Sequence, residues 1–113
     1  MANINKLLEA PPYAVEHGIK RLGENLRTAR IRRRHTIQEV AQKIGTGVRA
    51  VMDAEKGKPS TSIAVYVALL WAYDLLQPLE DIANPSKDEL GLAYDAARAP
   101  SRVRSAGGLD NDF

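Results

Sequence analysis

Four side chains between residues 48 and 53 could contact the edges of DNA bases. Val48, Arg49, Met52 and Asp53 share one face of the stretch if it is helical. An arginine can donate two hydrogen bonds to guanine, a valine can contact the methyl group of thymine, and an aspartate can accept from the cytosine amino group. The stretch on its own fits an ordinary amphipathic helix equally well. Base contact therefore depends on the elements that position these residues.

Two short helices joined by a glycine turn are predicted around this stretch. Thr36 with Glu39 three residues later has the spacing of a capping box, which begins a helix. Gly45 ends that helix, Gly47 begins the next, and Gly57 ends the second. Apolar residues at helical spacing form a shared inner face: Val40, Ala41, Ile44, Val51 and Ala54. The pattern predicts a helix-turn-helix.

Residues 22 to 77 resemble the Xre family, which includes the phage repressors and Cro. The matching positions are Glu39, Val40, Ala41, Gly45, Val51, Glu55 and Gly57. The resemblance implies a lambda-repressor-like fold in which the second helix enters the major groove. It also implies a partly buried ion pair between Arg30 and Glu55. Two positions depart from the family: Ile37 replaces a frequent phosphate-binding glutamine, and His35 replaces a leucine.

Contacts with DNA phosphates are expected at the start of the first helix and in the loop after the second. Because Ile37 has no polar side chain, backbone N–H groups at that helix start are expected to contribute. The loop holds two cations and three hydroxyls within residues 56 to 62. The candidates are Thr36, Ile37, Lys43, Lys56, Lys58, Ser60 and Thr61. His35 is expected to be a half-buried packing residue, and no metal site is predicted.

Composition excludes several classes of protein. The 113 residues are enough for one domain with its own core. The absence of cysteine excludes disulfides, cysteine-based zinc sites and a cysteine nucleophile. No paired carboxylates, Ser/His/Asp set or phosphate-binding loop is present, so neither an enzyme nor a cofactor is predicted. No run of 18 apolar residues and no signal peptide are found, so a cytoplasmic location is expected.

Positive charge is concentrated in the middle of the chain. Residues 19 to 58 carry eleven Lys and Arg against four Asp and Glu, a net charge of +7, within a total of +2. Such a patch indicates a polyanionic partner and binding that weakens with salt. The run of residues 30 to 34, RIRRR, either complements the dipole at a helix C-terminus or contacts phosphates, and both are possible.

The expected fold is all-α: about five core helices in a lambda-repressor-like bundle, then a C-terminal helix and a flexible tail. The expected divisions are an N-terminal extension over residues 1–18, a DNA-binding domain over 19–84, a C-terminal helix over 85–99 and a tail over 100–113. A helix is predicted over 13–34, and Gly18 allows a break in it. Ser86 with Glu89 predicts the cap of the last helix.

Residues 62 to 76, SIAVYVALLWAYDLL, are apolar on nearly every side, which predicts a helix buried all round. One side, with Ile63, Tyr66, Val67 and Leu70, is expected to cover the helix-turn-helix. The other side needs another partner, and a second copy of the chain would suit a palindromic operator. The expected dimer interface is Val65, Leu69, Trp71, Leu75, Leu76, Leu79 and Ile82.

The segment from about residue 58 to 104 resembles HipB-type regulators. Those proteins are antitoxins that bind their own operator as well as a HipA-like kinase toxin, so the resemblance implies such a toxin as partner. The last residues, GGLDNDF, are either a solubilising end or a peptide that binds a protein partner through Leu109, Asp110 and Phe113.

Three functions remain open from the sequence. The first is an operator-binding repressor that is also an antitoxin, and the second is a repressor without a toxin. The third is a protein-interaction module that has a helix-turn-helix core but does not recognise DNA.

Overall fold

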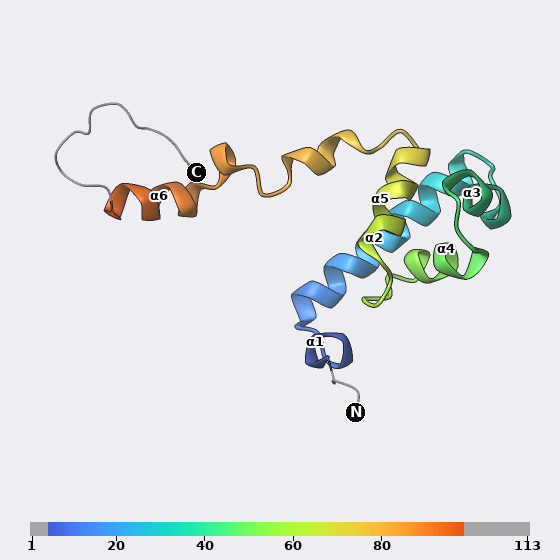
Figure 1. Ribbon diagram of the computed structural model, residues 1–113, viewed down its shortest axis with the longest axis horizontal. Helices are drawn as coiled ribbons and strands as arrows, with labels where there is room; N and C mark the ends of the chain where they lie inside the picture. The colour runs from blue at the N-terminus through green and yellow to red at the C-terminus, as the bar shows by residue number, and fades with distance from the viewer. Residues whose placement is uncertain (1–4, 99–113) are drawn as a thin grey trace. The chain divides into compact units, whose positions relative to one another are not determined.

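The computed structural model describes residues 5–98, whose regular elements are all helical, with no strand among them. The helices are α1 (Lys6–Glu9), α2 (Tyr13–Arg32), α3 (Ile37–Ile44), α4 (Val48–Glu55), α5 (Ile63–Ala72) and α6 (Glu89–Arg98) (Figure 1). Two 3-10 turns lie between α5 and α6, at Gln77–Asp81 and Pro85–Lys87. The all-α class expected from the sequence is therefore confirmed.

The chain divides into two units, Met1–Pro78 and Leu79–Phe113. The division falls earlier than the expected boundary at residue 84. At the other end, α2 crosses the expected boundary at residue 18 without interruption. No helix in the described part has both the length and the apolar character needed to span a membrane.

Helix α2 is one continuous helix of 20 residues, so the break considered at Gly18 is absent. Pro12 stands at its N-cap, where the missing N–H costs no intrahelical bond. A single glycine inside a helix costs only about 0.5–1 kcal/mol relative to alanine, too little to interrupt the hydrogen bonds on both sides. Helix α2 buries Gly23, Leu26 and Ala29.

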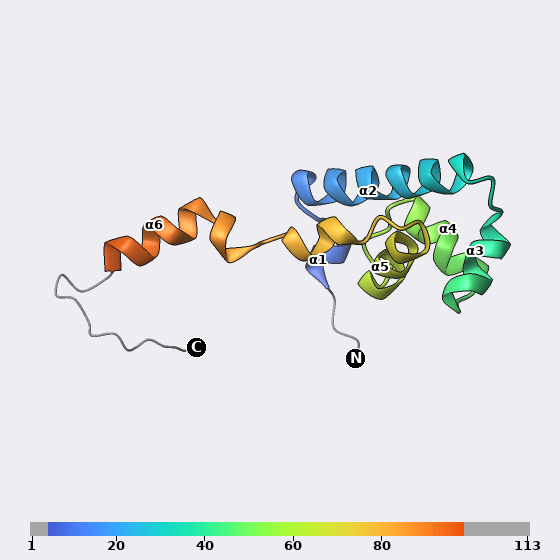
Figure 2. The ribbon, with the colours of Figure 1, turned by 90° about the horizontal axis from the view of Figure 1, so that it is seen from above.

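The core of the larger unit lies where α2, α3, α4 and α5 meet (Figure 2). Helix α4 packs against each of the other three, and α3 also packs against α5. The expected inner face is confirmed, since four of its five residues are buried and Ile44 packs against them. The buried side chains are Leu26, Ala29, Val40, Ala41, Val51, Ala54, Tyr66, Leu69 and Tyr73.

Two glycines allow α2 and the end of α4 to approach closely. A Cβ atom on Gly23 would lie 2.6 Å from the carbonyl oxygen of Ala54. A Cβ atom on Gly57 would lie 2.5 Å from the Cα atom of Lys20. Gly57 also has a φ of +70°, in the left-handed region that favours glycine. Neither position leaves room for a side chain.

Helix α5 is shorter and less buried than its composition predicts. It ends at Ala72, with Tyr73 as its C-cap, where residues to 76 were expected to continue it. Ile63 is 73% exposed, so the prediction that it covers α3 and α4 is wrong. Leu69 is 0% exposed and belongs to the core of its own chain, so its assignment to a dimer interface is also wrong. A helix that is apolar on every side gives no signal for which side faces the core.

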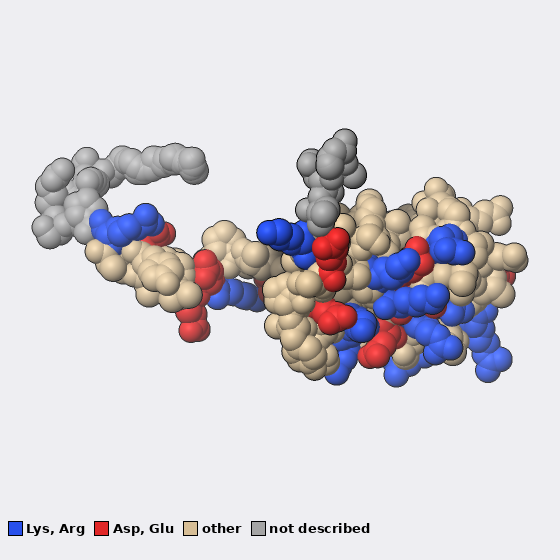
Figure 3. Space-filling model, turned by 90° about the horizontal axis from the view of Figure 1, so that it is seen from below, with Lys and Arg blue, Asp and Glu red and all other residues tan. Residues whose placement is uncertain are grey.

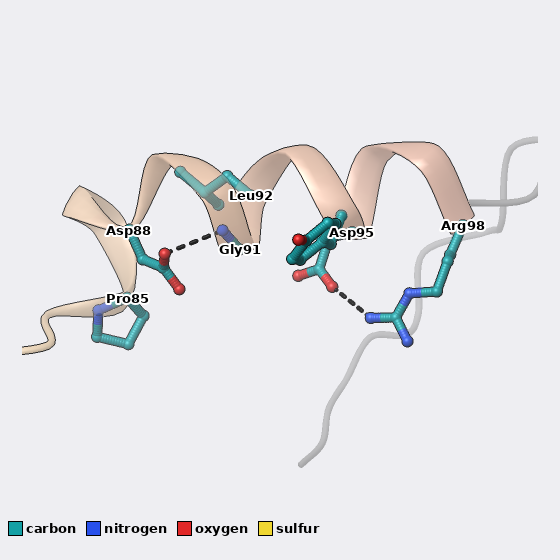
Figure 4. A pocket seen from close by; sticks show the side chains of 7 residues that line it. Pro85, Asp88, Gly91, Leu92, Asp95 and Arg98 are labelled. Carbon is teal, nitrogen blue, oxygen red and sulfur yellow. Dashed lines mark hydrogen bonds and ion pairs between the residues drawn. The ribbon is translucent and has the colours of Figure 1, made fainter. Parts of the chain in front are cut away.

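The second unit, as far as the structure describes it, has no buried residue. The Asn84 side chain accepts a hydrogen bond from the backbone N–H of Ser86, and so begins the 3-10 turn. The Asp88 carboxylate accepts from the backbone N–H of Gly91 at 2.9 Å in the first turn of α6 (Figure 4). Ser86 is therefore not the cap of the last helix, because Asp88 takes that role.

Candidate nucleic-acid interface

The helix pair α3 and α4 has the local geometry that its sequence predicts. The Thr36 hydroxyl accepts from the backbone N–H of Glu39 at 3.0 Å, and the Glu39 carboxylate accepts from the N–H of Thr36 at 2.8 Å. These bonds lower the pKa of Glu39. Gly45 ends α3 with a φ of +81°, and Gly47 stands at the N-cap of α4. The capping box and the left-handed glycine at the end of α3 are thus confirmed.

Arg30 and Glu55 form the expected ion pair between α2 and α4. The Arg30 Nε and Nη2 atoms donate to the two carboxylate oxygens of Glu55 at 2.6 and 3.0 Å. The third nitrogen, Nη1, donates to the carbonyl oxygen of His35 at 3.0 Å. The two side chains are only 12% and 6% exposed, and the bond to Glu55 raises the pKa of Arg30. The pair fixes the end of α4 to α2 and to the chain before α3.

The four residues proposed for base contact differ in how freely they face solvent. Val48 and Arg49 are exposed, whereas Met52 and Asp53 are half-buried. One Asp53 carboxylate oxygen lies 3.8 Å from the Lys58 ammonium, and the Asp53 carbonyl oxygen accepts from the Lys58 N–H. Arg49 is therefore the most accessible polar side chain of this face, while Asp53 also holds the loop after α4.

The residues proposed for phosphate contact do not form one group. Lys56, Lys58 and Ser60 are exposed in the loop after α4. The Thr61 hydroxyl oxygen is buried, and its N–H donates to the Lys58 carbonyl, so the proposed phosphate contact at Thr61 is wrong. The Lys43 ammonium lies 5.8 Å from the centroid of the Trp71 ring, on the side of α3 that meets α5.

Thr36 and Ile37 lie at the start of α3, as expected, but neither side chain is free to contact a phosphate. The Thr36 hydroxyl already accepts the capping bond from Glu39. The Ile37 side chain is half-buried and packs against the core. His35 is half-buried as expected, and its carbonyl oxygen is the group that Arg30 binds.

Arg33 has a structural role that the arginine run did not reveal. Its Nη1 donates to the Ala29 carbonyl at 3.0 Å and its Nη2 to the Tyr73 carbonyl at 2.9 Å. Its guanidinium carbon also lies 5.5 Å from the centre of the Tyr73 ring. Arg33 thus joins the ends of α2 and α5, although it is exposed like its neighbours Arg32 and Arg34. Burial raises the pKa of the Tyr73 hydroxyl to about 12.

Exposed cations gather on the larger unit. Lys and Arg side chains cover much of the face that α2 and α4 form, with Asp and Glu side chains among them (Figure 3). The accessible cations on α2 and around α4 are Lys20, Arg21, Arg27, Arg32, Arg34, Arg49, Lys56 and Lys58. The positive charge that the sequence concentrates between residues 19 and 58 is therefore exposed on the surface of the larger unit.

No family model, curated protein or solved structure matches the chain. Among the described residues, no group of three or more His, Cys, Asp and Glu side chains could hold a metal ion. The partner-binding tail proposed at Leu109, Asp110 and Phe113 lies outside the described residues.

Proposed function

We propose that the protein is a sequence-specific DNA-binding repressor, with a lambda-repressor-like helix-turn-helix formed by α3 and α4. The observation that carries the proposal is the exposed Arg49 near the start of α4, on a helix fixed by the Arg30–Glu55 pair. Such a helix can enter the major groove with its first turns toward the bases. The surrounding cations supply the charge needed for phosphates.

The division of roles within this surface follows from accessibility. Val48, Arg49, Met52 and Asp53 contact base edges in the proposal, and Arg49 has the strongest part because its five donors suit guanine. Lys56, Lys58 and Ser60 contact phosphates and set the position of the protein on the duplex. At the start of α3 the N–H of Glu39 is bonded to the Thr36 hydroxyl, so the proposal assigns the same purpose to the backbone N–H of Ile37.

Selection from a pool of random duplexes tests the proposal. The protein is expected to enrich one sequence, and fluorescence anisotropy with that duplex should show affinity that falls steeply between two salt concentrations. Binding that is absent, or equal for all sequences, would instead favour the protein-interaction module with a helix-turn-helix core.

Two substitutions separate base contact from phosphate contact. Arg49→Ala is expected to cost about 1–3 kcal/mol on the selected duplex and to relax the preference at one base pair. Lys58→Ala is expected to weaken binding to all duplexes alike and to lower the slope of log K against log salt by about 1. Anisotropy titrations with selected and scrambled duplexes measure both. If both variants bind every duplex as the parent does, the proposed orientation of α4 is wrong.

The proposal includes a homodimer, because a symmetric pair suits a palindromic operator. The exposed apolar side chains after Leu69 support it: Trp71 is 55% exposed and Leu75 is 43% exposed. Of the other proposed interface residues, Ile82 is exposed, and Val65, Leu76 and Leu79 are half-buried. Half-sites would then lie about 34 Å apart or at a multiple of that distance.

Trp71→Glu is expected to raise the dimer dissociation constant at least about tenfold, because the change removes a large apolar contact and places a charge in the interface. Light scattering over a range of protein concentrations measures this change. Ile31→Glu on α2 is the matched control, since Ile31 is 47% exposed and lies outside the proposed interface. A parent protein that is monomeric with and without DNA would contradict the dimer.

The resemblance to HipB-type regulators adds an antitoxin role and a HipA-like kinase toxin to the proposal. The second unit supports a protein partner, since Leu90, Leu92 and Tyr94 are at least half exposed there. Copurification of the protein with a kinase whose gene lies next to its own tests the proposed toxin partner. A repressor that purifies without such a partner would leave the DNA-binding proposal intact and remove the toxin.

A further inference from the structure

A small pocket opens where α2, α3 and α4 meet. Its volume is about 160 Å³, and its lining residues are Arg27, Ile37, Met52, Glu55 and Lys56. Sites for drug-sized molecules occupy about 300–1,000 Å³, so this pocket suits a smaller group. Met52 lies on the outward face of α4 that includes Arg49, so the pocket adjoins the surface proposed for DNA.

The charges at the pocket favour an anion beside an apolar group. The Glu55 carboxylate is balanced by Arg30, which binds both of its oxygens. Arg27 and Lys56 are exposed and make no ion pair with any described residue. Ile37 and Met52 supply apolar walls, to which the methylene stems of the two cations can add.

We infer that this pocket holds one deoxyribose of the bound DNA, while Arg27 and Lys56 donate to the phosphates on its two sides. The inference rests on the proposed DNA binding and adds Arg27 and the apolar pair Ile37 and Met52 to it. A sugar offers apolar C–H groups between two anions, which matches apolar walls between two cations. Ile37, which cannot bind a phosphate through its side chain, has a role here as a wall for the sugar.

Chemically altered duplexes test the phosphate half of the inference. In the duplex selected by the parent protein, each phosphate is replaced in turn by a neutral methylphosphonate. Besides the phosphates assigned to Lys58 and Ser60, the parent is expected to lose about tenfold in affinity at the two phosphates flanking one nucleotide of each half-site, since each would lose a charge-assisted bond. The Arg27→Gln variant is expected to become insensitive to the methylphosphonate at one of these two phosphates. Its slope of log K against log salt should fall by about 1.

Arg21→Gln is the matched control on the same helix. Arg21 is exposed, lies away from the pocket, and has its Nε atom 3.8 Å from the Glu24 carboxylate. This variant is expected to keep the parent's pattern of sensitive phosphates. Thermal unfolding of every variant verifies that the fold is retained.

A 2′-O-methyl group placed on single nucleotides tests the sugar half. The parent is expected to lose about tenfold at the nucleotide between the phosphates assigned to Arg27 and Lys56, because the added methyl group enlarges the sugar that must lie against Ile37 and Met52. Met52→Ala enlarges the pocket and should reduce that loss while leaving the effect at other nucleotides unchanged.

The outcomes separate this inference from the function on which it rests. If the parent selects no duplex, the proposed DNA binding fails and the pocket assignment fails with it. If the parent selects a duplex but Arg27→Gln keeps its phosphate pattern and salt slope, only the pocket assignment is overturned. Tolerance of the 2′-O-methyl group between the sensitive phosphates would likewise overturn the sugar contact.

Discussion

Glu55→Gln is expected to lower the free energy of unfolding by about 3–5 kcal/mol, the usual cost of removing one partner of a buried ion pair. Glutamine has nearly the same shape, so the loss would come from charge rather than from a cavity. Arg30 would keep its bond to the His35 carbonyl but would lose a carboxylate that binds its Nε and Nη2 atoms. At 12% exposure, its side chain cannot regain full hydration without moving.

Urea denaturation of the parent and the variant measures this difference. Glu24→Gln is the control, because the Arg21–Glu24 pair has side chains 62% and 73% exposed and should change stability by no more than about 0.5 kcal/mol. A double replacement, Arg30→Met with Glu55→Leu, should cost less than Glu55→Gln alone, since it leaves no unpaired buried charge. A loss below about 1 kcal/mol for Glu55→Gln would contradict the assigned role of the pair.

The features predicted well from the sequence are those that depend on short spacings or on a long family pattern. Thr36 and Glu39 are three residues apart, so their capping box is a local property of the chain. The Arg30–Glu55 pair spans 25 residues, and no local spacing predicts it. It was expected only because residues 22 to 77 resemble a family in which these two positions pair.

The failed predictions concern choices between alternatives that the sequence pattern fits equally well. Helix α5 is apolar on every side, so hydropathy could not place Leu69 inside and Ile63 outside. Ser86 and Asp88 are two residues apart and both are common capping residues, and the 3-10 turn at Pro85–Lys87 decides between them. Only the packed chain distinguishes these alternatives.

Part of the candidate site could not have been predicted by inspection of one element at a time. Arg33 stands in a run of cations that looks uniform in the sequence, yet it alone of these residues binds the carbonyl of Tyr73. The pocket lined by Arg27, Ile37 and Met52 takes one residue from each of three helices. Such sites depend on how closely α2, α3 and α4 approach, and two glycines control one of those approaches.

Gly57→Ala is expected to lower the free energy of unfolding by about 2–5 kcal/mol. Two costs add: about 1–2 kcal/mol for a side chain in the left-handed region at a φ of +70°, and about 1–3 kcal/mol for overpacking. The overpacking arises because the new Cβ atom would lie 2.5 Å from the Lys20 Cα atom and 2.9 Å from the Ile19 carbonyl oxygen. Backbone atoms of a helix cannot move aside as the end of a side chain can.

Gly45→Ala separates the conformational cost from the overpacking cost, because Gly45 has a φ of +81° but its added Cβ atom would have no atom within 4 Å. It should show the conformational cost of about 1–2 kcal/mol alone. Gly23→Ala and Gly18→Ala form a second pair on α2, since only the Gly23 Cβ atom would meet backbone, at 2.6 Å. Gly18→Ala should stabilise the helix by about 0.5–1 kcal/mol while Gly23→Ala destabilises it. Equal losses for Gly57→Ala and Gly45→Ala in urea denaturation would show that α2 and the end of α4 do not meet as closely as the structure places them.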